Sequence, residues 1–234
     1  MKSRPRTETS FLLQHLDARL ALLVSGPDPQ KRRDCELVLA DCVNRASGAG
    51  VTLPLLELQR RFGLDELELD LLLLAAWPQV NPAARQRTLC LGELLETYWA
   101  DPVDRVEAAA RLGQESPLRR YRLVDLWSVS PNLNEQVLQQ HLLAPPRVGA
   151  YLLGQQELGS GLNQVATLVP ADRHPPTTAW VEPEEAAVLQ EMVGRWSDHG
   201  ADRPLCLGLV GDPGSGKTRL CRTLASRAGL PVIE

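Results

Sequence analysis

Cysteine and histidine are scarce in this 234-residue chain, and neither occurs in a pattern that would bind a metal ion. The five cysteines include no C-x-x-C pair, and their odd number argues against a disulfide framework. The four histidines are scattered without the spacing of metal ligands. The sequence therefore gives no reason to expect a disulfide-stabilised scaffold or a structural zinc site.

An excess of basic residues and a long apolar run are also absent. The net charge is −4, so composition alone does not indicate a nucleic-acid-binding protein. The longest apolar stretch, Leu71 to Trp77, suits a buried helix and is too short to cross a membrane. The first residues carry positive charge but no signal-type apolar block follows them. We therefore expect a cytoplasmic protein that does not associate with membranes.

A phosphate-loop motif is present near the carboxyl end of the chain. Residues 211–218 read Gly-Asp-Pro-Gly-Ser-Gly-Lys-Thr, which matches the pattern G-x-x-x-x-G-K-T. The apolar run 205–210 before the motif is typical of a buried parallel strand, and residues 218–228 after it have helical periodicity that ends at Gly229. The sequence therefore predicts the first strand and helix of an α/β P-loop domain.

Each part of this motif has an expected role. The glycines allow successive main-chain N–H groups to surround phosphates, and the start of the following helix adds attraction for the same anion. Lys217 would contact the β- and γ-phosphates, and the Thr218 hydroxyl would ligate Mg²⁺. We therefore predict ATP and Mg²⁺ as cofactors, Lys217 and Thr218 as catalytic residues, and Thr218 as the metal ligand. The predicted nucleotide-binding residues are Gly211, Asp212, Pro213, Gly214, Ser215, Gly216, Lys217 and Thr218, with Asp212 expected to be a solvated turn residue.

The sequence offers little of the remaining machinery for phosphoryl transfer. The reaction also needs acidic residues on another strand, a group that orients water, and often an arginine from a neighbouring subunit. None of these can be assigned here, because residues 230–234 read only as the start of the next strand. One strand and one helix cannot cover both faces of a parallel sheet. We therefore expect residues 184–234 to be an incomplete P-loop domain, and the chain alone to hydrolyse ATP no faster than background.

The first 165 residues are predicted to form a mainly helical (α+β) interaction domain. Asp65 and Glu68 have the spacing of a helix capping box, and Gly63 would join two helices as in a helix-turn-helix. Two later strands would pair as the wing of a winged-helix domain. Helices are expected from about residue 10 to 25 and over 31–46, 53–62, 65–77, 102–112 and 144–154, and strands over 118–129 and 135–142.

Nucleic acid is not an expected partner of this domain. The helix over 65–77 carries four carboxylates in its first turns, where a DNA-recognition helix would carry Arg, Asn or Gln. These carboxylates would be repelled by a phosphate backbone. The cluster Arg119, Arg120 and Arg122 is interpreted as a solvated or salt-bridged strand face, with a nucleic-acid role as the alternative.

A proline-rich linker is predicted over residues 166–183, because Pro175 and Pro176 lie among few apolar residues. Pro183 followed by two glutamates then opens a helix that should end near Gly200. The predicted organisation is thus an interaction domain over 1–165, a linker over 166–183 and the start of an ATPase domain over 184–234.

Residues 205–234 resemble the start of a bacterial AAA+ ATPase module. The stretches 61–75 and 116–123 resemble the amino-terminal winged-helix region of AAA+ ATPases encoded with contractile injection systems. This resemblance implies a homo-oligomeric ring, a hexamer, that uses ATP to remodel or disassemble a protein partner bound through the amino-terminal domain. It places the nucleotide on residues 211–218, while the family's acidic motif, sensor residues and arginine finger have no counterpart in the sequence.

Two other functions remain open. The chain could be an adaptor that binds proteins through residues 1–165 and carries a vestigial phosphate loop; tight binding of Mg·ATP would count against this. It could also be another P-loop protein, such as a kinase or a signalling switch, with a regulatory winged helix. Four apolar residues followed by Asp-Glu, further along the gene, would favour the AAA+ interpretation.

Overall fold

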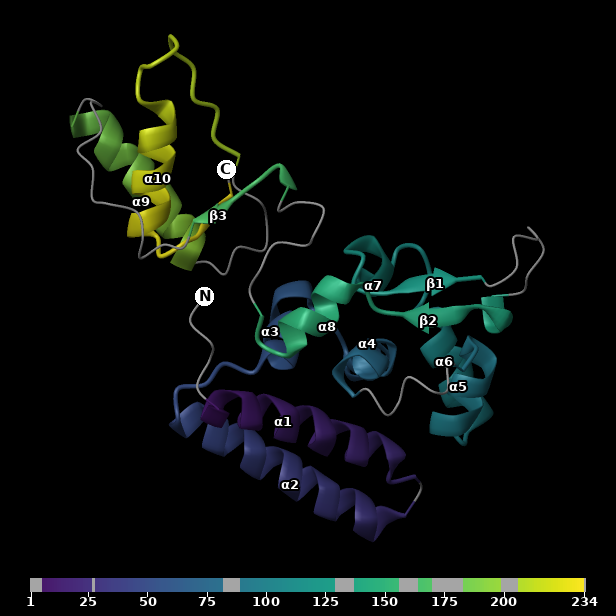
Figure 1. Cartoon of the computed structure of the whole chain (residues 1–234). Helices are drawn as coiled ribbons and strands as arrows, with labels where there is room; N and C mark the ends of the chain where they lie inside the picture. Colours follow the sequence, from purple (N-terminus) through teal and green to yellow (C-terminus); the bar gives the residue numbers. More distant parts are fainter. Residues whose placement is uncertain are drawn as a thin grey trace. The chain divides into compact units, whose positions relative to one another are not determined.

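The computed structural model describes residues 6–26, 28–81, 89–128, 137–155, 164–169, 183–198 and 206–233, and most of them are helical (Figure 1). The chain divides into two compact units, Met1–Gln156 and Glu157–Glu234. Most of the predicted proline-rich linker lies outside the described residues. No helix within these ranges combines the length and apolar character that crossing a lipid bilayer requires.

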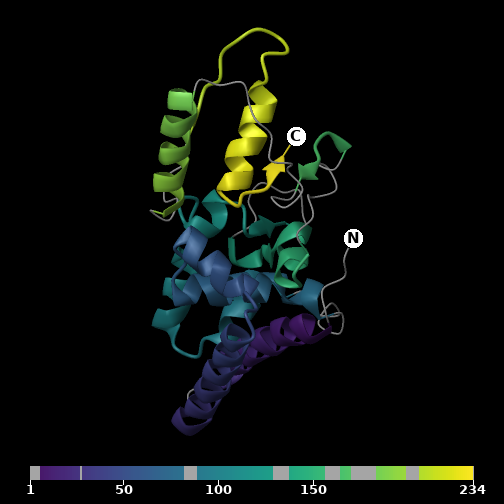
Figure 2. The same ribbon diagram turned by 90° about the vertical axis from the view of Figure 1, so that its left-hand side faces the viewer.

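The first unit begins with two long antiparallel helices, α1 (Arg6–Val24) and α2 (Pro29–Gly48), which lie side by side (Figures 1 and 2). Asp28 caps α2, since its carboxylate accepts from the Gln30 amide at 3.0 Å. Proline at the first position of α2 suits this start, because the ring fixes a helical φ and the missing N–H is not needed there. Both helices were predicted from their apolar periodicity, and both are present.

Two further helices, α3 (Pro54–Phe62) and α4 (Glu66–Val80), are joined through Gly63. Gly63 has φ 62°, a left-handed conformation that glycine adopts without steric cost. The capping box at the start of α4 is confirmed: the Glu68 amide donates to Asp65 at 2.8 Å, and the Asp65 amide donates to Glu68 at 3.0 Å. The sequence thus specifies this helix-turn-helix connection residue by residue.

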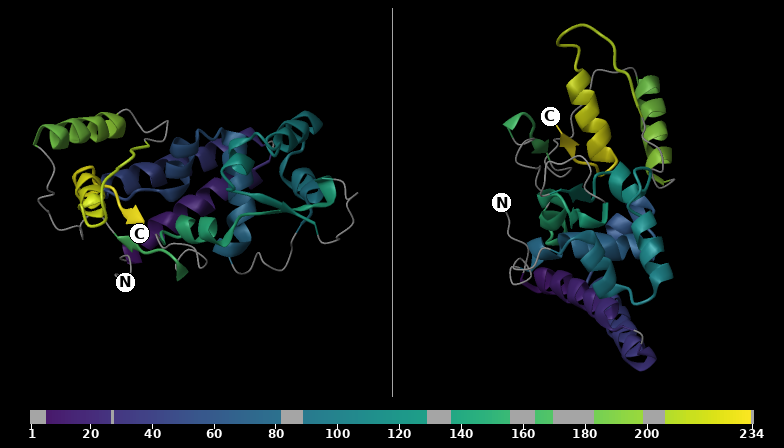
Figure 3. Two further views of the ribbon diagram at one scale, coloured as in Figure 1. Left: turned by 90° about the horizontal axis from the view of Figure 1, so that it is seen from above. Right: turned by 90° about the vertical axis from the view of Figure 1, so that its right-hand side faces the viewer.

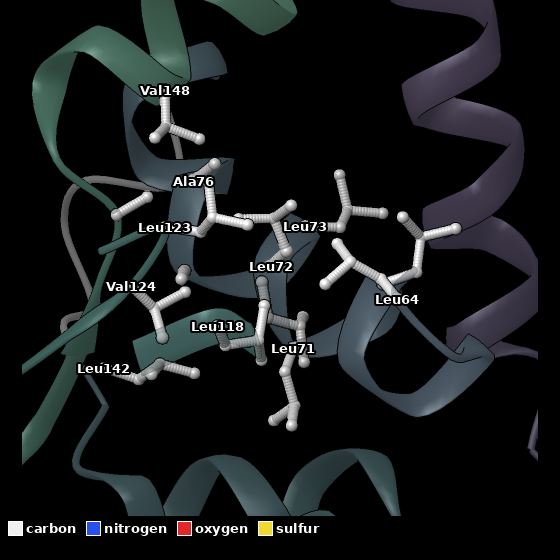
Figure 4. Packing of buried hydrophobic residues seen from close by; sticks show 14 of the residues in the cluster. Leu64, Leu71, Leu72, Leu73, Ala76, Leu118, Leu123, Val124, Leu142 and Val148 are labelled. Carbon is white, nitrogen blue, oxygen red and sulfur yellow. The ribbon is translucent and has the colours of Figure 1, made fainter. Parts of the chain in front are cut away.

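Helix α4 is the centre of the hydrophobic core of the first unit, as its run of apolar residues predicts. Leu71, Leu72 and Leu73 are fully buried. Figure 4 shows Leu71 and Leu72 beside Leu118, and Leu73 facing Leu64. Each buried leucine contributes roughly 1.5–3 kcal/mol to stability relative to an exposed one. Surrounding elements therefore pack against α4 from several sides.

The rest of the first unit consists of short elements around α4. Their order in the chain is three helices, a β-hairpin and a final helix. The elements are α5 (Leu91–Tyr98), α6 (Pro102–Ala110), α7 (Pro117–Arg120), β1 (Asp125–Trp127), the 3₁₀ helix η2 (Val137–Gln139), β2 (His141–Leu143) and α8 (Pro146–Leu152).

Strands β1 and β2 pair antiparallel, with Trp127 opposite His141 (Figure 3). Cys90 forms an isolated antiparallel bridge to the same His141, so β2 lies between β1 and Cys90. The Leu91 amide donates to the Gln140 carbonyl at 2.7 Å and extends this pairing. The predicted wing hairpin is therefore present, although both strands are shorter than expected.

One helix in this region was missed, and one strand prediction was wrong. Helix α5 was not predicted at all. The strand predicted over 118–129 is a strand only over 125–127, because Ser116 and Pro117 start helix α7: the Arg119 amide donates to the Ser116 hydroxyl at 3.5 Å. The arginine cluster therefore lies at a helix end, and not on a strand face.

The second unit contains β3 (Leu168–Val169), α9 (Pro183–Asp198), α10 (Lys217–Arg227) and β4 (Val232–Ile233). Helices α9 and α10 pack together and lie side by side (Figures 1 and 3); Val193, Leu220 and Leu224 are buried. Strands β3 and β4 pair antiparallel, with Leu168 opposite Ile233.

The strand predicted before the phosphate loop is not formed. Residues 206–210 make no strand, and Val210 is 100 % exposed. A parallel strand requires a hydrogen-bonded neighbour on its edge, and the described part of the second unit provides none for this segment. The helix of the predicted P-loop domain is therefore present, but its strand is not.

Candidate functional site

The predicted phosphate loop forms a tight turn that leads directly into α10. Gly214 has φ 84° and Gly216, the N-cap of α10, has φ 88°. The Ser215 amide donates to the Asp212 carbonyl at 3.1 Å, which closes the turn. A side chain at either glycine would strain these left-handed conformations, whatever space surrounds it. The two glycines therefore set the backbone path of the loop.

The Lys217 ammonium group folds back over this turn. It donates to the Gly211 carbonyl at 2.7 Å, to the Asp212 carbonyl at 2.8 Å and to the Ser215 hydroxyl at 3.2 Å. An ammonium group has three donors, and here all three have an acceptor within the loop. The positive charge is therefore held at the opening of the turn. A phosphate placed there would form stronger, charge-assisted hydrogen bonds than these neutral oxygens do.

The surroundings of the loop are electropositive. A hollow of about 630 Å³ is lined by three cationic side chains and by no carboxylate. The first-turn amides of a helix have no intrahelical acceptors, and the helix dipole places partial positive charge at this end of α10. The lining residues are Pro213, Gly214, Ser215, Gly216, Lys217, Thr218, Arg219 and Arg222.

All eight predicted nucleotide-binding residues, 211–218, lie in this one turn and the first residues of α10. Thr218 is exposed in the first helical turn, and Asp212 is exposed but is not part of the lining. Arg219 and Arg222 were not singled out from the sequence. Arg222 could have been found, because it lies four residues after Thr218 and therefore on the same face of the helix.

In the first unit, the carboxylates at the start of α4 bind arginines of the same chain. Arg19 of α1 donates from Nε to Asp70 at 2.7 Å and from Nη1 to Glu66 at 2.5 Å. Arg111 donates from Nε to Asp65 at 2.6 Å. Asp70 is largely buried in its ion pair, whereas the Glu66 and Asp65 side chains remain 69 % and 43 % exposed. Helix α1 packs against the face of α4 that carries Glu66 and Asp70, so α4 could not enter a DNA groove with that face.

His15 lies one helical turn before Arg19 and is buried, with 2 % of its surface exposed. Burial, together with the positive charge of Arg19, lowers the pKa of His15 from 6.5 to about 4. The histidine is therefore neutral at physiological pH. It has a structural role beside the ion pairs that join α1 to α4.

Helix α6, next to the hairpin, has an apolar and acidic outer face. Val103 is 63 % exposed and Val106 is 70 % exposed, and Asp104 and Glu107 are exposed beside them. Arg105 is half-buried and donates from Nη2 to the Ala100 carbonyl at 3.0 Å, just before the start of α6. This face would repel a phosphate backbone.

Comparison with known protein families matches residues 25–166 to a family described as "Winged helix domain, variant". A search of curated proteins and of solved structures gives no match. The matched segment covers more than half of the chain, and it includes the hairpin β1–β2 and all helices from α2 to α8. The chain therefore belongs to the variant winged helix domain family.

Proposed function

We propose that residues 211–218 bind the triphosphate of ATP, and that the chain is the ATP-binding part of an AAA+ ATPase. One observation carries this proposal: Lys217 is held over the carbonyls of Gly211 and Asp212 at the start of α10. A cation fixed above a glycine turn at a helix N-terminus is the arrangement that phosphate binding requires. The sequence resemblance of residues 205–234 favours the AAA+ class among P-loop proteins.

Each residue of the loop would have its own role in binding. Lys217 would exchange its carbonyl partners for phosphate oxygens, and Arg222 would add positive charge one turn further along α10. The Thr218 hydroxyl would hold Mg²⁺, and its exposure in the first turn fits this role. Bound Mg²⁺ supplies a positive charge that bridges phosphate oxygens and neutralises charge developing on them. No acidic residue lines the hollow, so we propose that this chain binds ATP without hydrolysing it.

The winged-helix unit would recognise a protein partner. The side of α4 that faces α1 is covered, and the outer face of α6 is acidic and apolar, so neither surface suits DNA. By resemblance, the whole ATPase would be a homo-oligomeric ring, a hexamer, that remodels this partner using ATP. The first unit would then hold the partner while the second unit binds the nucleotide.

A second function is favoured by a specific observation. Residues 206–210 form no strand, and Val210 is fully exposed, so the loop lacks the sheet that normally supports it. A chain that uses only its winged-helix unit, as an adaptor with a vestigial phosphate loop, fits this observation.

Isothermal titration calorimetry with Mg·ATP separates the two functions. The chain should bind Mg·ATP, and Lys217→Ala should weaken binding at least about tenfold, or about 1.4 kcal/mol. Arg227→Ala is the matched control, because it removes an exposed cation from the last turn of the same helix. Absence of heat with the unaltered chain, or equal affinity in the Lys217→Ala variant, would favour the adaptor.

A further inference from the structure

Arg122 has an unusual backbone conformation. Its φ is 52°, and it is the one residue other than glycine with positive φ in the part of the chain that the structure describes. It follows helix α7 in a Schellman motif: the Leu123 amide donates to the Leu118 carbonyl at 2.8 Å, and the Arg122 amide donates to the Arg119 carbonyl at 3.0 Å. Glycine is the usual residue at this position because it adopts the conformation without strain. An arginine at this position therefore strains the backbone, and such strain points to a functional role for the side chain.

The three arginines of this turn have no carboxylate partner among the described residues. Arg119, Arg120 and Arg122 form no ion pair, and Arg120 and Arg122 are exposed. Of the nine other arginines in the first unit whose side chains the structure describes, six bind a carboxylate. Those with such partners in this unit are Arg19, Arg32, Arg45, Arg60, Arg61 and Arg111.

Aromatic contacts hold this turn against the end of α3. The Tyr121 ring lies 4.8 Å from the Phe62 ring, centroid to centroid, and the Arg120 guanidinium lies 5.6 Å from the Tyr121 centroid. Tyr121 remains 44 % exposed. The turn is therefore held against α3, and the Arg120 guanidinium lies beside the aromatic pair.

The end of α3 adds more positive charge. Arg60 and Arg61 both bind Glu57, at 3.1 Å and 2.5 Å, so that two guanidinium groups share one carboxylate. The basic corner is defined here as these two arginines together with Arg119, Arg120 and Arg122. It holds five positive charges against one negative charge, in a chain whose net charge is −4.

We propose that the basic corner binds an acidic segment of a protein partner, rich in Asp and Glu. Guanidinium groups bind carboxylates through paired, charge-assisted hydrogen bonds, and clusters of arginine recognise acidic motifs. Tyr121, between the arginines, offers an aromatic surface for the apolar part of such a segment. This inference rests on the proposed role of the first unit as a partner-binding module, and it identifies the surface used.

Nucleic acid fits the basic corner less well. A duplex presents rows of phosphates, and a protein that binds it distributes cations along an extended surface. The corner comprises only the ends of α3 and α7. In the same unit, α6 exposes Asp104 and Glu107, which no described cation neutralises through an ion pair. A short acidic peptide matches the size of the corner better than a duplex does.

Fluorescence anisotropy on the whole chain tests this proposal. The probe is a labelled 12-residue peptide rich in Glu, and the reference is the same peptide with Gln in place of Glu. The Glu peptide should bind at least about tenfold more tightly than the Gln peptide, and Arg120→Glu or Arg122→Glu should remove that difference. Arg33→Glu is the matched control, because it makes the same charge change at an exposed arginine of α2 and should alter affinity less than twofold.

Arg122→Gly separates binding from folding. Glycine relieves the strained φ, so the melting temperature should rise by a few degrees while affinity for the Glu peptide falls. The proposal is overturned if the Glu peptide binds no better than the Gln peptide, if Arg33→Glu weakens binding as much as Arg120→Glu, or if a 12-base-pair duplex binds more tightly than the peptide at the same salt concentration. Lys217→Ala should leave peptide binding unchanged, so failure of the nucleotide site and failure of the basic corner are distinguishable.

Discussion

Arg19 in α1 donates from Nε to Oδ1 of Asp70 in α4 across 2.7 Å, and both side chains are largely buried. This ion pair, with the accompanying bond from Arg19 to Glu66, attaches the α1–α2 pair to the central helix. Asp70 is thereby neutralised inside the unit, and Glu66 is paired at its surface. Helix α4 therefore serves to hold the domain together, and partner recognition is left to other surfaces.

Replacing Arg19 should destabilise the first unit strongly. In Arg19→Met, Asp70 would stay buried without its partner, and we expect the free energy of unfolding to fall by about 3 kcal/mol. Arg45→Met is the matched control, because Arg45 pairs with Asp41 on the exposed side of α2 and should cost less than about 1 kcal/mol. Urea denaturation measures both. Equal losses in the two variants would contradict the role given to the Arg19–Asp70 pair.

Stability should fall as the pH is lowered from 7 to 4, in part because of His15. The unfolded chain takes up a proton on His15 near its ordinary pKa of 6.5, whereas burial keeps the folded pKa near 4. The unfolded state therefore binds more protons in this interval and is favoured as the pH falls, by up to about 3 kcal/mol from this group. The difference in unfolding free energy between the unaltered chain and His15→Gln should change with pH over this range. A difference that is constant between pH 7 and 4 would contradict the lowered pKa.

Gly63 should be required for its backbone conformation alone. Its φ is 62°, and a methyl group added there would meet no atom within 4 Å. Gly63→Ala should therefore cost about 1 kcal/mol through strain. Gly48→Ala is the control, since Gly48 also has open space around it but ends α2 without a positive φ. If thermal melting shows the same change in both variants, the strain argument fails.

Local signals in the sequence predicted much of the first unit. Asp65 and Glu68 marked the start of α4, and the apolar run 71–77 identified it as the buried helix, because these features depend only on neighbouring residues. The glycine turn before α10 was predicted in the same way, and Gly214 and Gly216 have left-handed φ angles. Its role in binding phosphate stays a prediction.

Features that depend on distant partners were not predicted correctly. The apolar run 206–210 has the composition of a strand but no neighbour to pair with, so it forms none. Cys90 bridges to His141, a residue about 50 positions later, which no local pattern could reveal. The arginines at 119, 120 and 122 were noticed in the sequence, but their position beside the end of α3 depends on the contact between Phe62 and Tyr121, which no local pattern reveals.

Nuclear magnetic resonance of the ¹⁵N-labelled chain tests the central claim most directly, because the claim is that main-chain amides of one loop surround a triphosphate. On addition of Mg·ATP, the amide signals of Gly214, Gly216, Lys217 and Thr218 should shift, while those of β1 and β2 in the other unit should not. AMP at the same concentration should produce much smaller shifts, since it lacks the β- and γ-phosphates. Loop signals that do not move on addition of Mg·ATP, or that move equally with AMP, would contradict the account.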